Sequence, residues 1–279
     1  MMTDARLNVP LVDRRVTVEI RVLGGFAVLV NDQPLAARGW GSRKAQHLIK
    51  LLALAPGHQL ATDALADTLW PDLDPDAARR ACYQAVYLAR KVLDPDHVGL
   101  LVLQQEMLTL DAPAGLTVDL AAFQAAARRA EQTRHPADYE AALARYTGEV
   151  LPEDRYAEWA ILPRETAQQQ YHQLLTASAA LATTRGRFDE ARGLWQQLLT
   201  SDPANETAHV ALMRLYATEG QRREALEQFR LLRAALRRNL DAEPEAASQQ
   251  LYAAILAGRV PEVGSRQSAV GSEEGAGAA

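Results

Sequence analysis

"DLDPDAARRACYQAVYLARKVLDP", residues 72–95, is the stretch that decides how this chain is interpreted. The chain as a whole is acidic, with 30 Lys and Arg against 35 Asp and Glu, yet residues 77–93 hold four cations and no acid. Asp74 can cap a helix that starts at Pro75, because a carboxylate accepts hydrogen bonds from the free N–H groups of a first turn. The stretch therefore predicts a helix with a locally basic surface.

At about 100° per residue, this helix has a small apolar face and an opposite polar face. The polar face comprises Arg79, Arg80, Tyr83, Gln84, Tyr87, Arg90 and Lys91. Arg binds guanine edges, Gln binds adenine edges, and Arg, Lys and Tyr bind phosphates. The face thus has the chemistry of a helix in a DNA major groove, and the alternative is an ordinary solvated helix surface.

The segments around this helix complete a recognisable layout. Alternating apolar residues from Val16 to Val22 predict a strand of a small antiparallel sheet. Two helices follow, with Ser42 and Thr62 as their expected N-caps, and a hairpin turns at residues 104–106. Sheet, three helices and hairpin over residues 16–112 predict a winged helix. Its expected contacts to the DNA backbone are Arg43 and Lys44 at the first helix start, and Gln104 and Gln105 at the hairpin tip.

The second half of the chain is predicted to be helical over residues 118–257, after a short connector at 113–117. Asp119 is the expected cap of its first helix. The segment that begins at Gly186 recurs 34 residues later at Gly220, with Trp195 replaced by Phe229. A helix-turn-helix repeat of about 34 residues is typical of tetratricopeptide repeats, which stack because one pair cannot bury its apolar face alone.

Composition excludes several classes of protein. No apolar run approaches the roughly 20 residues of a membrane span, and no signal peptide opens the chain. Cys82 is the single cysteine, which fits a cytoplasmic location. The histidines lack metal-ligand spacing and no catalytic constellation is present, so we expect no metal, no cofactor and no enzyme activity. We expect residues 1–15 to be a flexible arm and 258–279 a disordered tail.

Several stretches together resemble a known family. They include "RVLGGFAVLVNDQPL", "RKAQHLIKLLALAPGHQLATDALADTLWPDLDPDAARRACYQAVYLARKVLD", "VDLAAFQ", "YTGEVLPEDRYAEWA" and "GQRREALEQFRLLRAALRRNLDAEPEAASQQLYAAIL". In this order they resemble the bacterial transcriptional activator-domain proteins, which include the Streptomyces antibiotic regulatory protein family. The resemblance implies an OmpR/PhoB-type winged helix followed by a tetratricopeptide-like activator domain. It also implies a protein that binds promoter repeats and helps to recruit RNA polymerase.

The sequence departs from this family at informative places. Arg80, Ala81 and Cys82 stand where the family often has Asn and Leu, and the wing tip carries Glu106 instead of a cation. Residues 16–112 hold 9 Lys and Arg against 11 Asp and Glu. No phosphate-binding loop motif occurs, so no nucleotide switch is expected. These departures leave the base preference and the tightness of binding by a monomer open.

The resulting interpretation is a mainly α-helical, DNA-binding transcriptional regulator, an activator by resemblance. Its expected partners are double-stranded promoter DNA, RNA polymerase and a second copy bound through the helical repeats, with no membrane. The alternative is a protein-interaction adaptor whose repeats bind a partner and whose acidic winged helix does not bind DNA.

Overall fold

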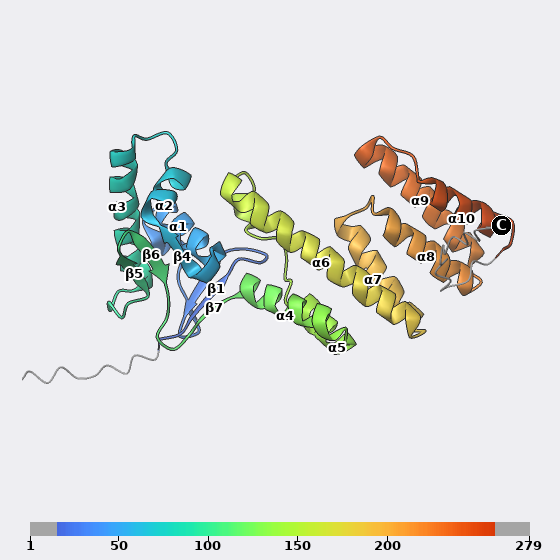
Figure 1. Ribbon diagram of the computed structural model, residues 1–279, viewed down its shortest axis with the longest axis horizontal. Helices are drawn as coiled ribbons and strands as arrows, with labels where there is room; N and C mark the ends of the chain where they lie inside the picture. The colour runs from blue at the N-terminus through green and yellow to red at the C-terminus, as the bar shows by residue number, and fades with distance from the viewer. Residues whose placement is uncertain (1–15, 260–279) are drawn as a thin grey trace, which may run out of the picture. The chain divides into compact units, whose positions relative to one another are not determined.

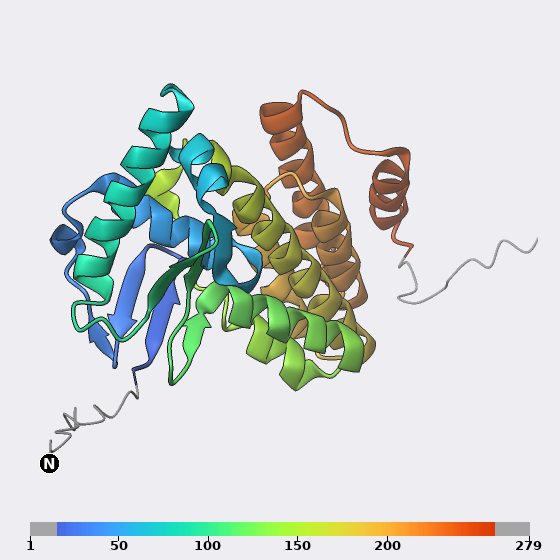
Figure 2. The same cartoon turned by 60° about the vertical axis from the view of Figure 1, so that its left-hand side comes forward.

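The computed structural model describes residues 16–259 (Figures 1 and 2). The expected arm at 1–15 and all but the first two residues of the expected tail lie outside this range. The chain divides into two compact units, the first ending at Leu174 and the second beginning at Leu175.

The first unit begins with a four-stranded sheet in the order β3-β2-β1-β7. Its strands are β1 (Val18–Arg21), β2 (Ala27–Val30), β3 (Gln33–Pro34) and β7 (Leu116–Val118). β1 pairs antiparallel with β2 and parallel with β7. Val18, Ile20 and Val22 are buried, while Glu19 and Arg21 point outward and pair with each other at 2.6 Å. The predicted alternation in β1 is confirmed, because residues two apart share a face of a strand.

Three helices follow: α1 (Arg43–Leu54), α2 (Thr62–Leu69) and α3 (Pro75–Leu93). Short 3-10 turns, η1 (Ala37–Trp40) and η2 (Pro56–His58), flank α1. Ser42 caps α1 by accepting from the Lys44 amide, and Asp74 caps α3 by accepting from the Ala77 amide at 3.0 Å. The cap predicted at Thr62 is wrong. Thr62 is the first residue of α2, and its hydroxyl donates to the Glu106 carboxylate instead.

A three-stranded sheet forms the wing, with the order β4-β6-β5. The predicted hairpin is β5 (Leu101–Gln104) and β6 (Met107–Leu110), and β4 (Gln59–Ala61) adds to it from the segment before α2. Gln105 and Glu106 take positive φ angles of 47° and 63°. Two such residues form the tight turn that matches the twist of paired strands.

The expected connector after the wing is wrong in part. Leu116 and Thr117 belong to β7, so the chain returns to the first sheet before it becomes helical. The helices of this region are α4 (Asp119–Thr133), α5 (Pro136–Leu143) and the start of α6 (Glu158–Thr184). The helical region predicted from Val118 onward is interrupted between α5 and α6 by a loop that contains the turn η3 (Pro152–Asp154). That loop is what binds the helices to the first sheet.

Backbone groups join this loop to the end of β1. The Gly24 amide donates to the Glu149 carbonyl, and the Leu151 amide donates to the Val22 carbonyl, both at 2.8 Å. Gly24 and Gly148 approach so closely that a Cβ on Gly148 would lie 2.9 Å from the Cα of Gly24. A side chain at position 148 is therefore excluded unless the backbone shifts.

Asp119 makes a second connection to the same strand end. The sequence predicted that Asp119 would cap α4 from outside the helix. This prediction is wrong, because α4 begins at Asp119 itself. Its carboxylate accepts from the amides of Val22 at 2.9 Å and Leu23 at 3.0 Å, as well as from its neighbour Leu120. These amides lie beyond the sheet pairing of β1, and an unpaired buried N–H group is costly. Asp119 therefore ties the helical region to the winged helix.

A buried ion pair makes the third connection. Lys50 of α1 is 1% exposed and Asp154 of η3 is 4% exposed. The Lys50 ammonium donates to the Asp154 carboxylate and, at 2.8 Å, to Glu153. His47 also lies 3.1 Å from Asp154 and packs edge-on against Trp159. Burial raises the pKa of Asp154, but the hydrogen bonds and charges of Lys50 and, to a smaller extent, His47 lower it, and the net effect is a lowered pKa.

Arg164 of α6 organises the loop from its other side. Arg164 is 8% exposed, and its guanidinium donates to the carbonyls of Val150 at 3.0 Å, Leu151 at 3.2 Å and Asp154 at 3.3 Å. An Arg carries several donors in a fixed planar array, which suits several carbonyls around one turn. The winged helix, α4, α5 and the start of α6 are consequently one compact unit.

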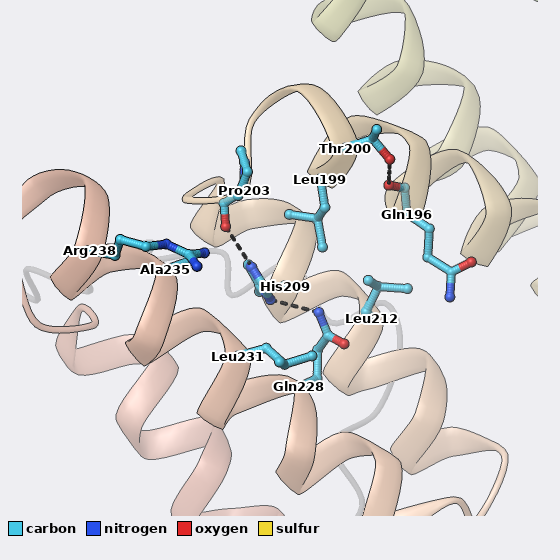
Figure 3. Close-up of a pocket in the computed structure, with 10 residues that line it drawn as sticks. All are labelled: Gln196, Leu199, Thr200, Pro203, His209, Leu212, Gln228, Leu231, Ala235 and Arg238. Atoms are coloured by element: carbon cyan, nitrogen blue, oxygen red, sulfur yellow. Dashed lines mark hydrogen bonds between the residues drawn. The ribbon is translucent and has the colours of Figure 1, made fainter.

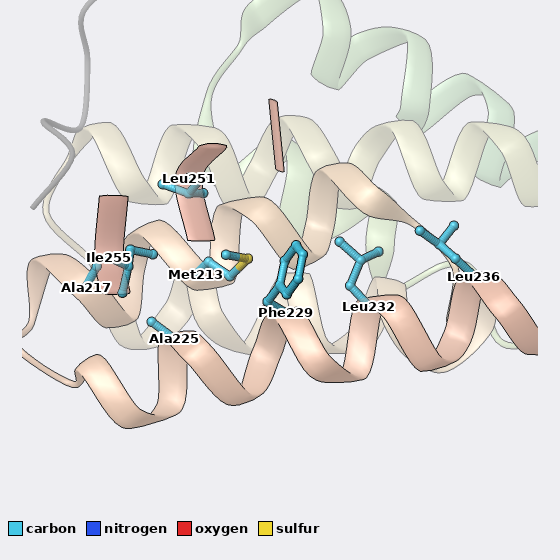
Figure 4. Packing of buried hydrophobic residues seen from close by; sticks show 8 residues of the cluster. All are labelled: Met213, Ala217, Ala225, Phe229, Leu232, Leu236, Leu251 and Ile255. Carbon is cyan, nitrogen blue, oxygen red and sulfur yellow. The ribbon is translucent and has the colours of Figure 1, made fainter. Parts of the chain in front are cut away.

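The second unit contains the rest of α6 with α7 (Phe188–Ser201), α8 (Glu206–Thr218), α9 (Arg222–Leu240) and α10 (Ala246–Leu256). The predicted repeat is visible in its turns, because Gly186 and Gly220 take positive φ angles of 72° and 76°. Residues from α8, α9 and α10 form one buried cluster (Figure 4). The Phe229 ring of this cluster stacks on the Tyr252 ring, with 4.4 Å between the ring centres. The predicted class, mainly α with a small β component and a winged helix before helical repeats, is confirmed.

Within residues 16–259, no helix is both long enough and apolar enough to span a membrane.

Candidate nucleic-acid interface

The polar face of α3 lies on the surface of the first unit, as predicted. Cys82, Ala85, Val86, Ala89 and Leu93 are all buried on the opposite side of the helix. Burial raises the pKa of the Cys82 thiol to about 11, so this side chain is a protonated apolar core residue. The buried face fixes which side chains of α3 point outward.

Three residues of the predicted face are engaged within the protein. The Arg79 guanidinium donates to Asp63 of α2 at 3.0 Å, and the Tyr83 hydroxyl donates to Glu106 of the wing at 3.1 Å. The hydrogen bond to Glu106 raises the pKa of Tyr83, so its phenol stays neutral. Arg90, which is half-buried, donates to the Leu101 carbonyl at 2.9 Å. These three residues align α2, α3 and the wing with one another.

Four residues of the face have no hydrogen-bond or ion-pair partner for their side chains among residues 16–259. They are Arg80, Gln84, Tyr87 and Lys91, and all four are exposed, with Tyr87 61% exposed. They span about 16 Å along the helix at roughly 1.5 Å per residue. Two cations, an amide and a phenol thus remain available for a ligand.

The two cations at the start of α1 also differ in whether they are bound within the protein. Lys44 is half-buried; its ammonium donates to the Leu69 carbonyl at the end of α2 and lies 5.6 Å from the centre of the Trp70 ring. Positive charge at a helix C-terminus is favourable, because the last carbonyls carry partial negative charge. Arg43 is exposed and reaches Asp154 only at 3.7 Å. Arg43 is therefore the freer of the two for a phosphate contact.

The tip of the wing is exposed but uncharged except for Glu106. Gln104 and Gln105 face solvent. Glu106 accepts from the Thr62 hydroxyl at 2.8 Å as well as from Tyr83, and its carbonyl accepts from the Thr62 amide. The acidic residue of the wing is thus a structural link between wing, α2 and α3, a role that its position in the sequence does not reveal.

Sequence reasoning missed Asp63, Thr62 and Glu106 as partners of this face. A weak signal for Asp63 exists, because the first turn of the second helix in a winged helix lies close to the start of the third. The contacts of Glu106 depend on where the hairpin turns and on the register of its strands, so they could not be predicted from the sequence. The side chains that the structure leaves open for DNA are a subset of those that the sequence proposed.

Comparisons with known proteins agree with this architecture. Residues 118–256 match the bacterial transcriptional activator domain. The chain is 29% identical over 249 residues to the regulatory protein AfsR of Streptomyces coelicolor, covering 84% of this chain and 24% of AfsR. It is 28% identical over 254 residues to the transcriptional regulator RedD of the same organism, covering 86% of this chain and 71% of RedD.

The fold is also found among solved structures. EmbR of Mycobacterium tuberculosis, determined in complex with a low-affinity phosphopeptide, superposes with a TM-score of 0.66 at 22% identity. The alignment covers 89% of this chain and 66% of EmbR. The chain spans about a quarter of the length of AfsR.

The relatives are regulators of transcription, and the predicted resemblance is confirmed. The domain match begins at Val118, where β7 ends and α4 begins. This chain is a winged helix joined to a bacterial transcriptional activator domain, and it belongs with the regulators that carry that domain.

Proposed function

We propose that this protein is a sequence-specific DNA-binding regulator of transcription, with α3 inserted in the major groove. The observation that carries the proposal is the exposed face of α3, which has no acid, on a winged-helix scaffold. Arg80 and Gln84 are the side chains for base edges, while Tyr87 and Lys91 contact phosphates. Arg43 and the wing amides of Gln104 and Gln105 add backbone contacts.

Arg79, Tyr83 and Arg90 have a second role in this proposal. They hold α2, α3 and the wing in register and lie beside the DNA. The pair between Arg79 and Asp63 is exposed on both sides, so it contributes little to stability and DNA phosphates can replace it. In this proposal, the domain predicted at residues 16–112 binds DNA and the domain predicted at residues 118–257 activates transcription.

Activation requires a contact with another protein, and we propose RNA polymerase. The segment around the start of α6 supports a protein contact. Tyr156, just before the helix, is 93% exposed, and within the helix Ile161 is 41% exposed and Leu162 is 72% exposed. Exposed apolar side chains gathered in a short segment indicate an interaction site. A homodimer through the helical repeats is the further proposed assembly.

The adaptor remains the second candidate, favoured by the net charge of the winged helix. Nine cations against eleven acids over residues 16–112 give a net charge of −2, so the long-range electrostatics of the winged helix do not favour its approach to DNA. The Glu106 carboxylate accepts hydrogen bonds from the hydroxyls of Thr62 and Tyr83. An acid at the wing tip with this internal role gives only weak support to a loss of DNA binding. An adaptor binds a partner protein and no DNA, even at low salt.

Fluorescence anisotropy with DNA from upstream of the protein's own gene tests the proposal. We expect wild type to prefer that duplex over a scrambled one, with affinity that falls steeply as salt rises. The double variant Arg80→Ala/Lys91→Ala should lose roughly 1–3 kcal/mol of discrimination from Arg80 if it makes a bidentate base contact. Loss of a phosphate contact at Lys91 should reduce the salt slope by about one.

The matched control is Arg128→Ala/Arg214→Ala. Both arginines are exposed, lie outside the winged helix and have no side-chain partner among residues 16–259. This variant changes net charge by the same amount, so it should retain the preference for the cognate duplex. Equal binding of both duplexes by wild type, or equal losses in the two variants, would count against α3 as the specific element. Absence of binding at low salt favours the adaptor.

A further inference from the structure

The second unit contains a pocket of about 380 Å³ formed by α7, α8, α9 and the loop between α7 and α8 (Figure 3). Every residue that lines it belongs to this unit, so its geometry does not depend on the winged helix. A volume of this size is typical of sites for small molecules. Its lining combines apolar, hydrogen-bonding and cationic side chains in separate places.

A buried pair of polar side chains forms one wall. His209 is 4% exposed, and its Nε2 lies 3.1 Å from the Pro203 carbonyl oxygen. A carbonyl only accepts, so Nε2 carries the proton and Nδ1 must accept from the Gln228 amide nitrogen, 2.6 Å away. Burial lowers the pKa of His209, which agrees with a neutral ring.

This arrangement fixes the orientation of the Gln228 amide. Its nitrogen is turned to His209, so its carbonyl oxygen is the group left over, and Figure 3 shows that oxygen pointing away from the imidazole. No hydrogen bond to this oxygen is found among residues 16–259. A pre-oriented acceptor at the wall of a pocket selects a ligand that carries an N–H or O–H group.

Arg238 supplies a cation at another side of the pocket. Figure 3 shows its guanidinium directed toward the side of the pocket that holds His209. Within the described residues no carboxylate pairs with it, although its neighbour Arg237 pairs with Glu243 at 2.5 Å. A guanidinium without an internal partner is suited to a carboxylate, which it binds through two parallel hydrogen bonds.

The acids nearest to His209 are already bound elsewhere. Asp202 accepts from the Asn205 side chain at 3.0 Å, and Glu206 accepts from the Glu245 amide at 2.8 Å. Both carboxylates raise the pKa of His209 only as secondary influences behind burial. Arg238 therefore remains the charged group that is free to select the sign of a ligand's charge.

Three leucines provide the apolar part of the lining. Leu199 comes from α7, Leu212 from α8 and Leu231 from α9. Leu231 is 51% exposed, although its neighbour Leu232 is fully buried in the core of the unit. An exposed leucine beside a pocket gains favourable burial when an apolar ligand covers it.

We propose that this pocket is a binding site for a small amphipathic carboxylate that also carries an N–H or O–H donor. The carboxylate pairs with Arg238, the donor binds the Gln228 carbonyl oxygen, and the apolar part packs on Leu199, Leu212 and Leu231. An N-acylated apolar amino acid has all three features. Such a ligand would make the second unit a sensor, a role separate from DNA binding by α3.

N-acetyl-L-leucine is the probe, with binding to the full chain measured by calorimetry and by amide chemical shifts. We expect saturable binding, with shift changes centred on His209 and Gln228. N-acetyl-L-leucine amide, which lacks the carboxylate, should bind at least about tenfold more weakly, as expected for loss of a charge-assisted pair. 4-Methylpentanoate, which lacks the N–H group, should also bind more weakly.

Arg238→Gln should weaken binding of N-acetyl-L-leucine at least about tenfold, while Arg233→Gln should leave it unchanged. Arg233 is exposed on the same helix and does not line the pocket, so it controls for net charge. Leu231→Ala should weaken binding, and Leu240→Ala, exposed outside the pocket, should not. No saturable binding by wild type, or equal effects of the two Arg variants, overturns the proposal. Both outcomes are independent of whether α3 binds DNA.

Discussion

Replacing Lys50 by Met is expected to lower the free energy of unfolding by about 3–5 kcal/mol. The variant keeps the length of the side chain but removes the ammonium that pairs with Asp154, which is 4% exposed. A buried carboxylate without its partner retains the cost of desolvation and loses the compensating attraction. Chemical denaturation of wild type and variant at pH 7 measures the difference.

Two further variants separate this effect from a general loss of packing. Lys91→Met removes an exposed ammonium from the same unit and should change stability by no more than about 0.5 kcal/mol. Lys50→Met combined with Asp154→Leu should recover much of the loss, because apolar replacement of a whole buried pair is often close to neutral. A loss below about 1 kcal/mol in the single variant would show that Asp154 is adequately satisfied by His47 alone.

Stability should also fall as the pH is lowered. The pKa of Asp154 is lower in the folded protein than its ordinary value, so its contribution is complete above that ordinary value. The contribution is lost as the pH falls through the lowered pKa of the folded state. Protonation removes the same ion pair that the Lys50→Met variant removes.

A fragment that ends at Ala112 is expected not to fold, whereas a fragment that ends at Leu174 should fold as a cooperative unit. The shorter fragment loses β7 from the edge of β1, and it loses the partners of Val22, Leu23 and Gly24. It also leaves Lys50 buried without Asp154. Circular dichroism and amide NMR spectra of residues 16–112 and 16–174 compare the two directly.

Reversible thermal unfolding of the longer fragment is the positive control for this comparison. Dispersed amide signals from residues 16–112 alone would show that the winged helix is independent of the loop at 144–157. In that case the contacts of Asp119 and Asp154 would be secondary to the core of the winged helix. Failure of both fragments would instead place the necessary contacts beyond Leu174.

Local patterns predicted much of the fold. The alternation in β1, the caps at Ser42 and Asp74, and the apolar face of α3 depend on neighbours within a few residues, and all are confirmed. The 34-residue repeat placed the turns at Gly186 and Gly220 correctly, because a helix end favours glycine at a positive φ. These features follow from periodicity and from capping chemistry.

The features that sequence reasoning missed depend on pairs that are distant in the chain. Asp119 was expected to cap its own helix, because the sequence cannot show that it accepts from amides almost a hundred residues earlier. Lys50 was not distinguished from a solvated lysine, although it is 1% exposed. The polar face of α3 remains a prediction as a DNA site, and the structure reduces its free members to Arg80, Gln84, Tyr87 and Lys91.

Under the proposed function, the contacts that join the winged helix to the helical region bear on promoter architecture. These contacts are the close approach of Gly24 and Gly148 and the hydrogen bonds of Asp119 and Asp154. These contacts hold α4, α5 and the start of α6 against the winged helix. The position of α3 in the major groove therefore determines on which side of the DNA those helices lie. B-DNA turns once in about 10.5 base pairs. Inserting about five base pairs between the binding site and the promoter would therefore turn that surface to the opposite side of the DNA, while ten would restore it.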